Sequence, residues 1–186
     1  MFKFINLLLG SCLLLLSCEN TSKPVSNPSQ ANAQHNDSLL VAETLIKFHA
    51  AAGRSDLEGY FSFFTEDAVF IGTDANEHWD KASFYAYAQA PFAAGRGWNF
   101  KALDRHIYLS KQGDLAWFDE LLDAPYAKIA RGSGVLVKTD AGWKINQYVL
   151  SMTIPNALAD SIVAIKAPLE QLLIDSLSIQ PVYLNN

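Results

Sequence analysis

The sequence predicts an α+β fold in which a curved antiparallel sheet wraps around N-terminal helices. Apolar residues recur at helical spacing from Leu39 to Phe48 and again around Phe84. From Trp98 onward, apolar and polar residues alternate as they do in strands. Short turn sequences divide this second half into four consecutive strands, and a curled sheet around the helices is the economical way to bury such a set.

The first half is expected to be mainly helical. Its predicted elements are, in chain order, a helix capped by Asp37 or Ser38 and stopped at Gly53, a shorter helix capped by Asp56, a strand over 68–72, and a helix over 78–95 that fades at Pro91. The four strands of the second half are expected over 98–110, 115–124, 128–139 and 143–154.

A last helix is expected after the sheet, which ends at Pro155. It covers 156–177 and is kinked or broken at Pro168. Its apolar side chains are expected to pack back on the domain through Leu158, Ile162, Ile165 and Leu172.

The N-terminus has one positive charge, Lys3, and then a short apolar run, as a secretory signal does. The run ends at "LLSC", which resembles the lipobox of bacterial lipoproteins. That resemblance implies cleavage before Cys18 and its lipidation; Cys12 is a competing site, and an ordinary signal peptide is the alternative. Several acyl chains give a stable anchor. We therefore expect a protein of the bacterial cell envelope that touches the membrane through this lipid only.

These features divide the chain into four predicted parts. They are a signal peptide over 1–17, a lipidated flexible tether over 18–37 that is rich in Ser, Asn, Gln and Pro, a folded domain over 38–156, and a C-terminal helix and tail over 157–186.

Composition excludes several classes of function. The formal net charge is −5 and no basic run occurs, which argues against nucleic-acid binding. Once Cys18 is lipidated and Cys12 removed, no cysteine is left for a disulfide, a nucleophile or a thiolate metal site. The histidines lie on different predicted elements, and no phosphate loop or dinucleotide fingerprint occurs. We expect neither a metal nor a cofactor.

The order of elements and several stretches resemble the nuclear transport factor 2-like superfamily, also called the SnoaL-like or cystatin-like cone. The stretches are "AAGRSDLEGYFSFFTEDAVFIG", "GTDANEHWDKASFYAYAQAPFAAGRGWNF", "AWFDELLD", "RGSGVLVK" and "GWKINQYVLS", within 44–156. The resemblance implies the fold firmly. It implies function weakly, because the superfamily includes isomerases, dehydratases, hydrolases and non-catalytic modules. It also implies a homodimer formed through the outer face of the sheet.

The catalytic residues of one relative, ketosteroid isomerase, are not present. Its oxyanion tyrosine falls on Phe48, its general base on Gly72, and its protonated aspartate near Gly132 or Gly134. Phenyl and hydrogen side chains neither donate nor accept a proton. Ser133 is not a nucleophile either, because the flanking glycines of a nucleophile elbow are missing.

Charged residues within strands are the informative candidates for a site, because they are costly to bury unless they are paired. If "DAPYAK" is a hairpin with Pro125 and Tyr126 at its tip, Glu120 lies opposite Arg131. By the same register Trp117 lies opposite Gly134, on the other face of the sheet. Which of the two pairs faces the interior stays open.

Further candidates lie at the end of the first strand, around Asp74 and Glu77, although Asp74 or Asn76 is also a natural cap for the next helix. Arg105, in mid-strand, needs a partner. The candidate ligand-binding residues are therefore Asp74, Glu77, Trp79, Trp98, Arg105, Trp117, Glu120 and Arg131.

The leading functional interpretation is a lipid-anchored domain that binds a small apolar or weakly charged ligand without catalysis. One alternative is an isomerase, dehydratase or hydrolase that uses Asp119 or Glu120 with Arg131. Another is a homodimeric assembly module without a ligand.

Overall fold

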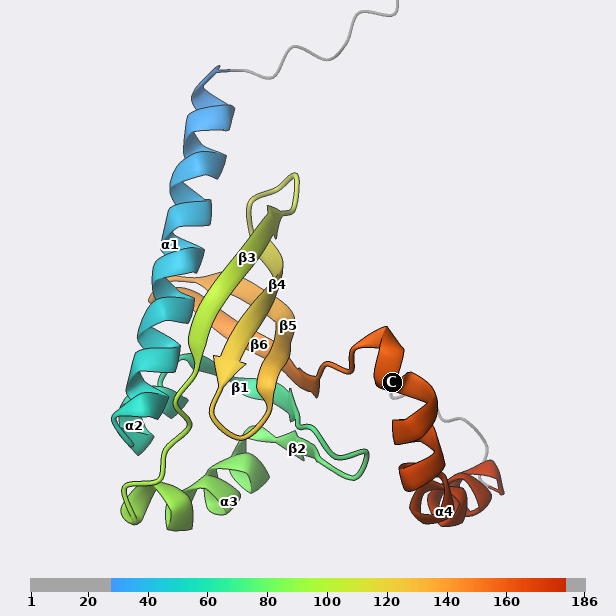
Figure 1. Cartoon of the computed structure of the whole chain (residues 1–186). Coiled ribbons are helices and arrows are strands. Elements are labelled where there is room, and N and C mark those ends of the chain that lie inside the picture. The colour runs from blue at the N-terminus through green and yellow to red at the C-terminus, as the bar shows by residue number, and fades with distance from the viewer. Residues whose placement is uncertain (1–27, 180–186) are drawn as a thin grey trace, which may run out of the picture.

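The structure, a computed structural model, describes residues 28–179 of the 186-residue chain (Figure 1). The predicted signal sequence and Cys18 lie outside the described residues. The elements are α1 (Pro28–Gly53), α2 (Leu57–Phe61), β1 (Phe64–Ile71), β2 (His78–Asp80), α3 (Lys81–Ala93), β3 (Lys101–Leu109), β4 (Leu115–Ala124), β5 (Lys128–Thr139), β6 (Gly142–Met152), a 3-10 turn (Asn156–Leu158) and α4 (Ala159–Ser178).

All six described strands belong to one sheet, in the order β2-β1-β6-β5-β4-β3. The strands β3 to β6 form an antiparallel meander, as the turn sequences predict. The pairing of β1 with β6 is parallel, and it joins the short strands of the first half to the meander. The predicted class, α+β with a curved sheet and N-terminal helices, is confirmed.

The core lies between the sheet and the first three helices. Helix α1 runs along the sheet and α3 lies across one end of it (Figure 1). Alternate residues of β4 are buried, as expected for a strand with one face on the core. The largest fully buried side chains are Tyr148, Phe48, Phe84, Leu45, Leu122, Leu136, Ile145, Glu120 and Val41. One of these, Glu120, is a carboxylic acid.

Helix α1 begins earlier than the sequence predicts. Asp37 does not cap it, because its carboxylate accepts hydrogen bonds from Lys138 Nζ at 2.7 Å and Trp143 Nε1 at 3.4 Å. The Ser38 hydroxyl donates to Gln34 O inside the helix. Both candidate caps therefore lie within α1, which starts at Pro28.

Two boundaries around β1 also differ from the prediction. Strand β1 begins at Phe64, because α2 is a short helix that ends at Phe61. Trp79 lies in strand β2 rather than in a helix, and it pairs with Phe70. Helix α3 begins after Asp80, whose carboxylate accepts a hydrogen bond from Ser83 N at 2.7 Å. The predicted caps Asp74 and Asn76 are therefore wrong, whereas the predicted cap Asp56 of α2 is confirmed.

The C-terminal helix is present, but it does not pack on the domain as expected. Figure 1 shows α4 standing away from the sheet, and none of its residues is buried. Leu158, Ile165 and Leu172 are all more than half exposed. Pro168 lies inside the helix. Among the described residues, no helix is long and apolar enough to cross a membrane.

Candidate functional site

A cavity of about 270 Å³ opens between the helices and the inner face of the sheet. Helices α1, α2 and α3, strands β1, β2 and β6, and the β4–β5 hairpin all contribute to its wall. The lining residues are Phe48, His49, Tyr60, Phe70, Gly72, Thr73, Glu77, Trp79, Phe84, Tyr87, Trp98, Phe100, Tyr126, Tyr148 and Leu150. Aromatic rings dominate this set, and Glu77 supplies its carboxylate group.

Many of the rings that line the cavity lie nearly parallel to one another. Phe70 makes interplanar angles of 4° with Tyr148 and 14° with Phe84. Trp98 makes angles of 6° with Phe84 and 11° with Tyr87. These rings come from β1, β6, α3 and the segment before β3. Several elements of the fold therefore hold the rings in nearly parallel orientations.

A buried polar cluster centred on Glu120 lies behind the aromatic wall. The Oε1 atom of Glu120 is 2.7 Å from His49 Nε2 and accepts a hydrogen bond from the Tyr148 hydroxyl at 3.0 Å. The Oε2 atom accepts two hydrogen bonds from Arg105, from Nε at 2.8 Å and from Nη2 at 2.5 Å. We call these four residues, His49, Arg105, Glu120 and Tyr148, the Glu120 cluster.

The sheet register places the members of the Glu120 cluster together. Arg105 on β3 is the cross-strand neighbour of Glu120 on β4. On the other side, Glu120 faces Gly132 of β5. A Cβ atom on Gly132 would lie 2.3 Å from the Tyr148 hydroxyl and 2.9 Å from Glu120 Oε1, so only glycine leaves room for this hydrogen bond.

The electrostatics of the cluster favour an ionised Glu120. Burial by itself raises the pKa of this carboxyl group, but the hydrogen bonds and positive charge supplied by His49 and Arg105 outweigh burial and lower the pKa below its ordinary value. Burial raises the pKa of Tyr148 well above its ordinary value, and the negative charge of Glu120 raises it further. Tyr148 is therefore a neutral phenol that donates to a carboxylate.

His49 connects the Glu120 cluster to the cavity. Its side chain lines the cavity and its residue is only 7% exposed. Its Nε2 atom is taken by Glu120, whereas Nδ1 is buried and has no hydrogen-bond partner. A buried polar atom without a partner costs about 1–3 kcal/mol.

The structure brings five of the eight predicted site residues to this region. Glu77, Trp79 and Trp98 line the cavity, and Arg105 and Glu120 lie behind its floor. Glu77 is half-buried, and its Oε2 atom also accepts a hydrogen bond from Asp74 N at 3.1 Å.

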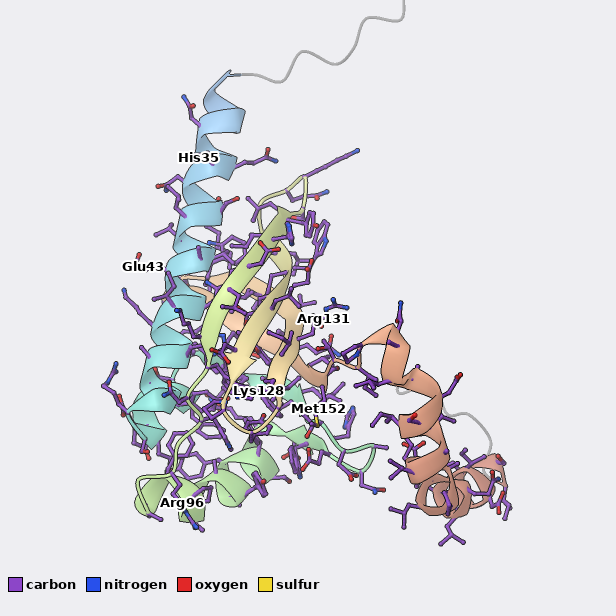
Figure 2. The ribbon with its side chains drawn as sticks, in the orientation of Figure 1. His35, Glu43, Arg96, Lys128, Arg131 and Met152 are labelled. Carbon is purple, nitrogen blue, oxygen red and sulfur yellow. The ribbon has the colours of Figure 1, made fainter. Side chains whose placement is uncertain are left out.

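The other three predicted residues lie elsewhere. Asp74 is exposed, and its side chain accepts hydrogen bonds from Asn76. Trp117 lies on the outer face of the sheet, 47% exposed, where it stacks on Tyr108. Figure 2 shows Arg131 on the side of the sheet away from α1, and it is exposed.

The predicted pairing of Glu120 with Arg131 is wrong. The hairpin loop contains three residues, 125–127, and Lys128 after it adopts a φ of 61°. The register is therefore shifted by one residue, so that Arg131 pairs with Leu121 and Val135 faces Trp117. A shift of one residue moves a side chain to the opposite face.

Sequence reasoning missed His49 as a site residue, although a signal was present. Val41, Leu45, Phe48 and Ala52 lie at helical spacing on the buried face of α1. His49 follows Leu45 by four residues, so it lies on the same face as an isolated polar side chain. Such a residue requires a buried partner. The described residues contain no group of three or more metal-ligating side chains.

Comparison with known proteins identifies the fold. The SnoaL-like domain family matches residues 41–155. None of the curated proteins compared with the chain is significantly similar to it in sequence.

Three solved structures illustrate the likeness in fold. A protein of unknown function from Mycobacterium tuberculosis has 18% identity and a TM-score of 0.57, covering 71% of this chain and 79% of that one. A putative scytalone dehydratase from Novosphingobium aromaticivorans has 12% identity and a TM-score of 0.57, covering 67% and 89%. A domain with a cystatin-like fold from Nostoc punctiforme has 18% identity and a TM-score of 0.55, covering 78% and 98%.

Proposed function

The chain belongs to the SnoaL-like domain family, and on that premise we propose that its cavity binds a small, mainly apolar molecule with one polar group. The observation that carries this proposal is a cavity of about 270 Å³ whose wall consists mainly of aromatic side chains. The apolar part of a ligand can cover these rings, and Thr73 or Glu77 at the wall can meet its polar group. Ligand sites are commonly apolar clefts with a few well-placed polar groups.

The size of the cavity restricts the ligand. Its volume of about 270 Å³ is slightly below the range for small-molecule sites, which span about 300–1,000 Å³. Glu77, which has no basic partner among the described ion pairs, disfavours anionic ligands at this wall. A neutral ligand of one or two rings fits both constraints.

The proposal is tested with 2-methylnaphthalene, which has the apolar shape but no polar group. We expect NMR titration to show saturable shifts at residues that line the cavity. Thr73→Trp places an indole in the cavity wall and should abolish these shifts, whereas Ala141→Trp, on the exposed β5–β6 turn, should leave them intact. Equal behaviour of the two variants would contradict the proposal.

Acid–base catalysis is a second candidate function, favoured by the 2.7 Å contact between Glu120 and His49. The catalytic residues expected from the sequence, Asp119 or Glu120 with Arg131, do not lie together. Asp119 contacts His106, and both side chains are about half exposed. Arg131 is exposed. His49 with Glu120 is the pair that fits a general base. Some structural neighbours are described as putative dehydratases.

The test of catalysis is exchange of the α-protons of 2-tetralone in D₂O. His49 would accept the carbon-bound proton, and the enolate would take up a deuteron. We expect exchange above the buffer rate that is lost in His49→Gln but kept in His106→Gln. Exchange at the buffer rate in the unaltered protein would refute acid–base catalysis and leave ligand binding as the proposed function.

We also propose that the domain is held at a membrane in the bacterial cell envelope by lipid on Cys18. The support is the mainly apolar run of residues 4–16, which is followed by Ser17 and this cysteine. Cys18→Ser should release the protein into the soluble fraction, and Cys12→Ser should not. Membrane retention of Cys18→Ser would count against the anchor.

A homodimer through the outer sheet face is the remaining proposal. Its support is the stacked pair of Tyr108 and Trp117, 5.8 Å apart and each about half exposed. Light scattering should show a dimer that Trp117→Arg dissociates. A monomer at all concentrations tested would refute it.

A further inference from the structure

The cavity wall contains a single carboxylate within a mainly aromatic surface. This group belongs to Glu77, which is half-buried and directly precedes β2. The backbone holds the residue in place, because Gly72 N donates to Glu77 O at 2.8 Å and Glu77 N donates to Asp74 O at 3.0 Å. The Oε2 atom accepts a hydrogen bond from Asp74 N at 3.1 Å, and a Cβ atom on Gly72 would collide with the same oxygen. The carboxylate therefore lies against the end of β1, at the wall of the cavity.

The charge of Glu77 is not neutralised by its surroundings. Among the described ion pairs, Glu77 has no basic partner. Burial raises the pKa of Tyr126, which also lines the cavity, and the negative charge of Glu77 raises it further, so Tyr126 stays a neutral phenol. The ring nitrogens of His49 are not available to Glu77 or to a ligand, because Nε2 contacts Glu120 and Nδ1 is buried. One part of the cavity wall is therefore negative.

From this arrangement we infer that the polar group of the ligand is a quaternary ammonium ion, which lies among the aromatic rings and beside Glu77. This inference rests on the proposed binding function and names the class of its ligand. The faces of aromatic rings attract cations, and indole does so most strongly. Trp79 and Trp98 both line the cavity. A neutral molecule of the same shape gains the apolar burial but not the electrostatic attraction.

The methylated form of the cation follows from the shortage of hydrogen-bond acceptors in the wall. A primary ammonium group has three N–H donors, and each donor needs an acceptor when it is buried. Besides Glu77, the oxygen-bearing side chains of the lining are Thr73 and tyrosines, and the Tyr148 hydroxyl is engaged with Glu120. A quaternary ammonium ion has no donor to satisfy, and its methyl groups make apolar contacts with the rings.

The rings also provide a place where the charge stays partly hydrated. Tyr87 and Tyr126 are 51% and 56% exposed, whereas Phe84 is buried, so the wall runs from buried to half-exposed rings. Tyr87 stacks on Trp79, with the ring centroids 4.9 Å apart, and its centroid lies 6.4 Å from that of Trp98. The apolar part of a ligand can cover the buried rings while its charge remains at the half-exposed end. This position lowers the cost of removing water from the cation.

The first test uses NMR titration of the unaltered full chain with three probes. They are benzyltrimethylammonium, its uncharged isostere neopentylbenzene, and benzylammonium. We expect the quaternary ion to bind about ten-fold more tightly than benzylammonium, because donors without acceptors are costly. Added salt should weaken binding of the quaternary ion but not of neopentylbenzene, because salt screens the charge of Glu77. Benzylammonium that binds as tightly as the quaternary ion, or a salt-independent affinity of the quaternary ion, would overturn the inference.

The second test removes the charge and keeps the shape of the side chain. In Glu77→Gln an amide oxygen can still accept the hydrogen bond from Asp74 N. We expect about five-fold weaker binding of benzyltrimethylammonium, the upper end for a partly exposed ion pair, and unchanged binding of neopentylbenzene. Asp74→Asn is the matched control, because it removes the same charge from an exposed neighbour outside the lining. It should leave both affinities unchanged, and an equal effect of the two variants would contradict the role of Glu77.

The outcomes separate the inference from the proposed function. Binding of 2-methylnaphthalene without binding of benzyltrimethylammonium would refute the inference and leave the binding function standing. Failure of 2-methylnaphthalene and of all three probes to bind the folded, unaltered protein would refute the binding function itself. Because the first test needs only the unaltered protein, a Glu77→Gln variant that does not fold leaves the inference testable.

Discussion

The most informative perturbation of the Glu120 cluster is Arg105→Met, which removes one charge of a buried ion pair. The side chain of Glu120 is 0% exposed and that of Arg105 is 12% exposed. Arg105 supplies two of the four hydrogen-bonding contacts of the Glu120 carboxylate. Removal of one partner leaves the other as a buried charge, which costs about 3–5 kcal/mol of unfolding free energy.

The assay is urea denaturation at about pH 7 and about pH 5, with Arg131→Met as the matched control. Arg131 is exposed, so its loss should change the free energy of unfolding by about 0.5 kcal/mol or less. A cost for Arg105→Met below about 1 kcal/mol, or one equal to that of the control, would refute the reasoning.

The pH dependence gives a second check on the same variant. In the unaltered protein the pKa of Glu120 is lowered, so its stabilising contribution is present above the ordinary carboxyl range and is lost as pH falls through the folded-state pKa. Without Arg105 only His49 and Tyr148 remain to offset burial, so we expect the pKa of Glu120 to rise. Protonation then relieves the buried charge in acid, so the deficit of Arg105→Met relative to the unaltered protein should shrink between pH 7 and pH 5.

Three further predictions concern other parts of the domain. Tyr148→Phe deletes the hydrogen bond to Glu120 and should cost about 1.5–3 kcal/mol in urea denaturation, as bonds to charged groups do. A Cβ on Gly134 would lie 2.1 Å from Gln147 O on β6. Gly134→Ala should therefore lower the free energy of unfolding by about 1–3 kcal/mol through overpacking. An unchanged urea midpoint would contradict the close contact between β5 and β6 at this residue. Deletion of residues 157–186 removes no buried residue of α4, so calorimetry should show the same midpoint within a few degrees, whereas a large decrease would show that α4 packs on the domain.

The sheet shows which features a single sequence determines. Its meander was predictable because each strand alternates and each turn contains Gly, Asp or Pro. The register of β4 on β5 was not, because "DAPYAK" fits both a two-residue and a three-residue loop. The three-residue form requires a positive φ at Lys128, which nothing in the local sequence demands. That one residue decides that Gly132 and not Arg131 lies opposite Glu120.

The site itself was predictable only in part, for a similar reason. Glu120 and Arg105 were identified because charges within strands need partners, and Trp79 and Trp98 because aromatic residues suit a cavity. His49 was missed because its partner lies 71 positions away on β4. No local pattern reveals a contact between a helix and a strand that are distant in the chain.

The Glu120 cluster depends on a residue without a side chain. At Gly132 the vacant Cβ position lies next to the Glu120 carboxylate and the Tyr148 hydroxyl, so any larger residue would displace one of them. The two remaining partners come from distant parts of the chain, His49 from α1 and Arg105 from β3. The three positions at which the sequence lacks the expected catalytic residues, Phe48, Gly72 and Gly132, therefore do not leave this region without polar groups. A carboxylate, an arginine, a histidine and a tyrosine meet behind the cavity wall, and each of them is placed by a different helix or strand.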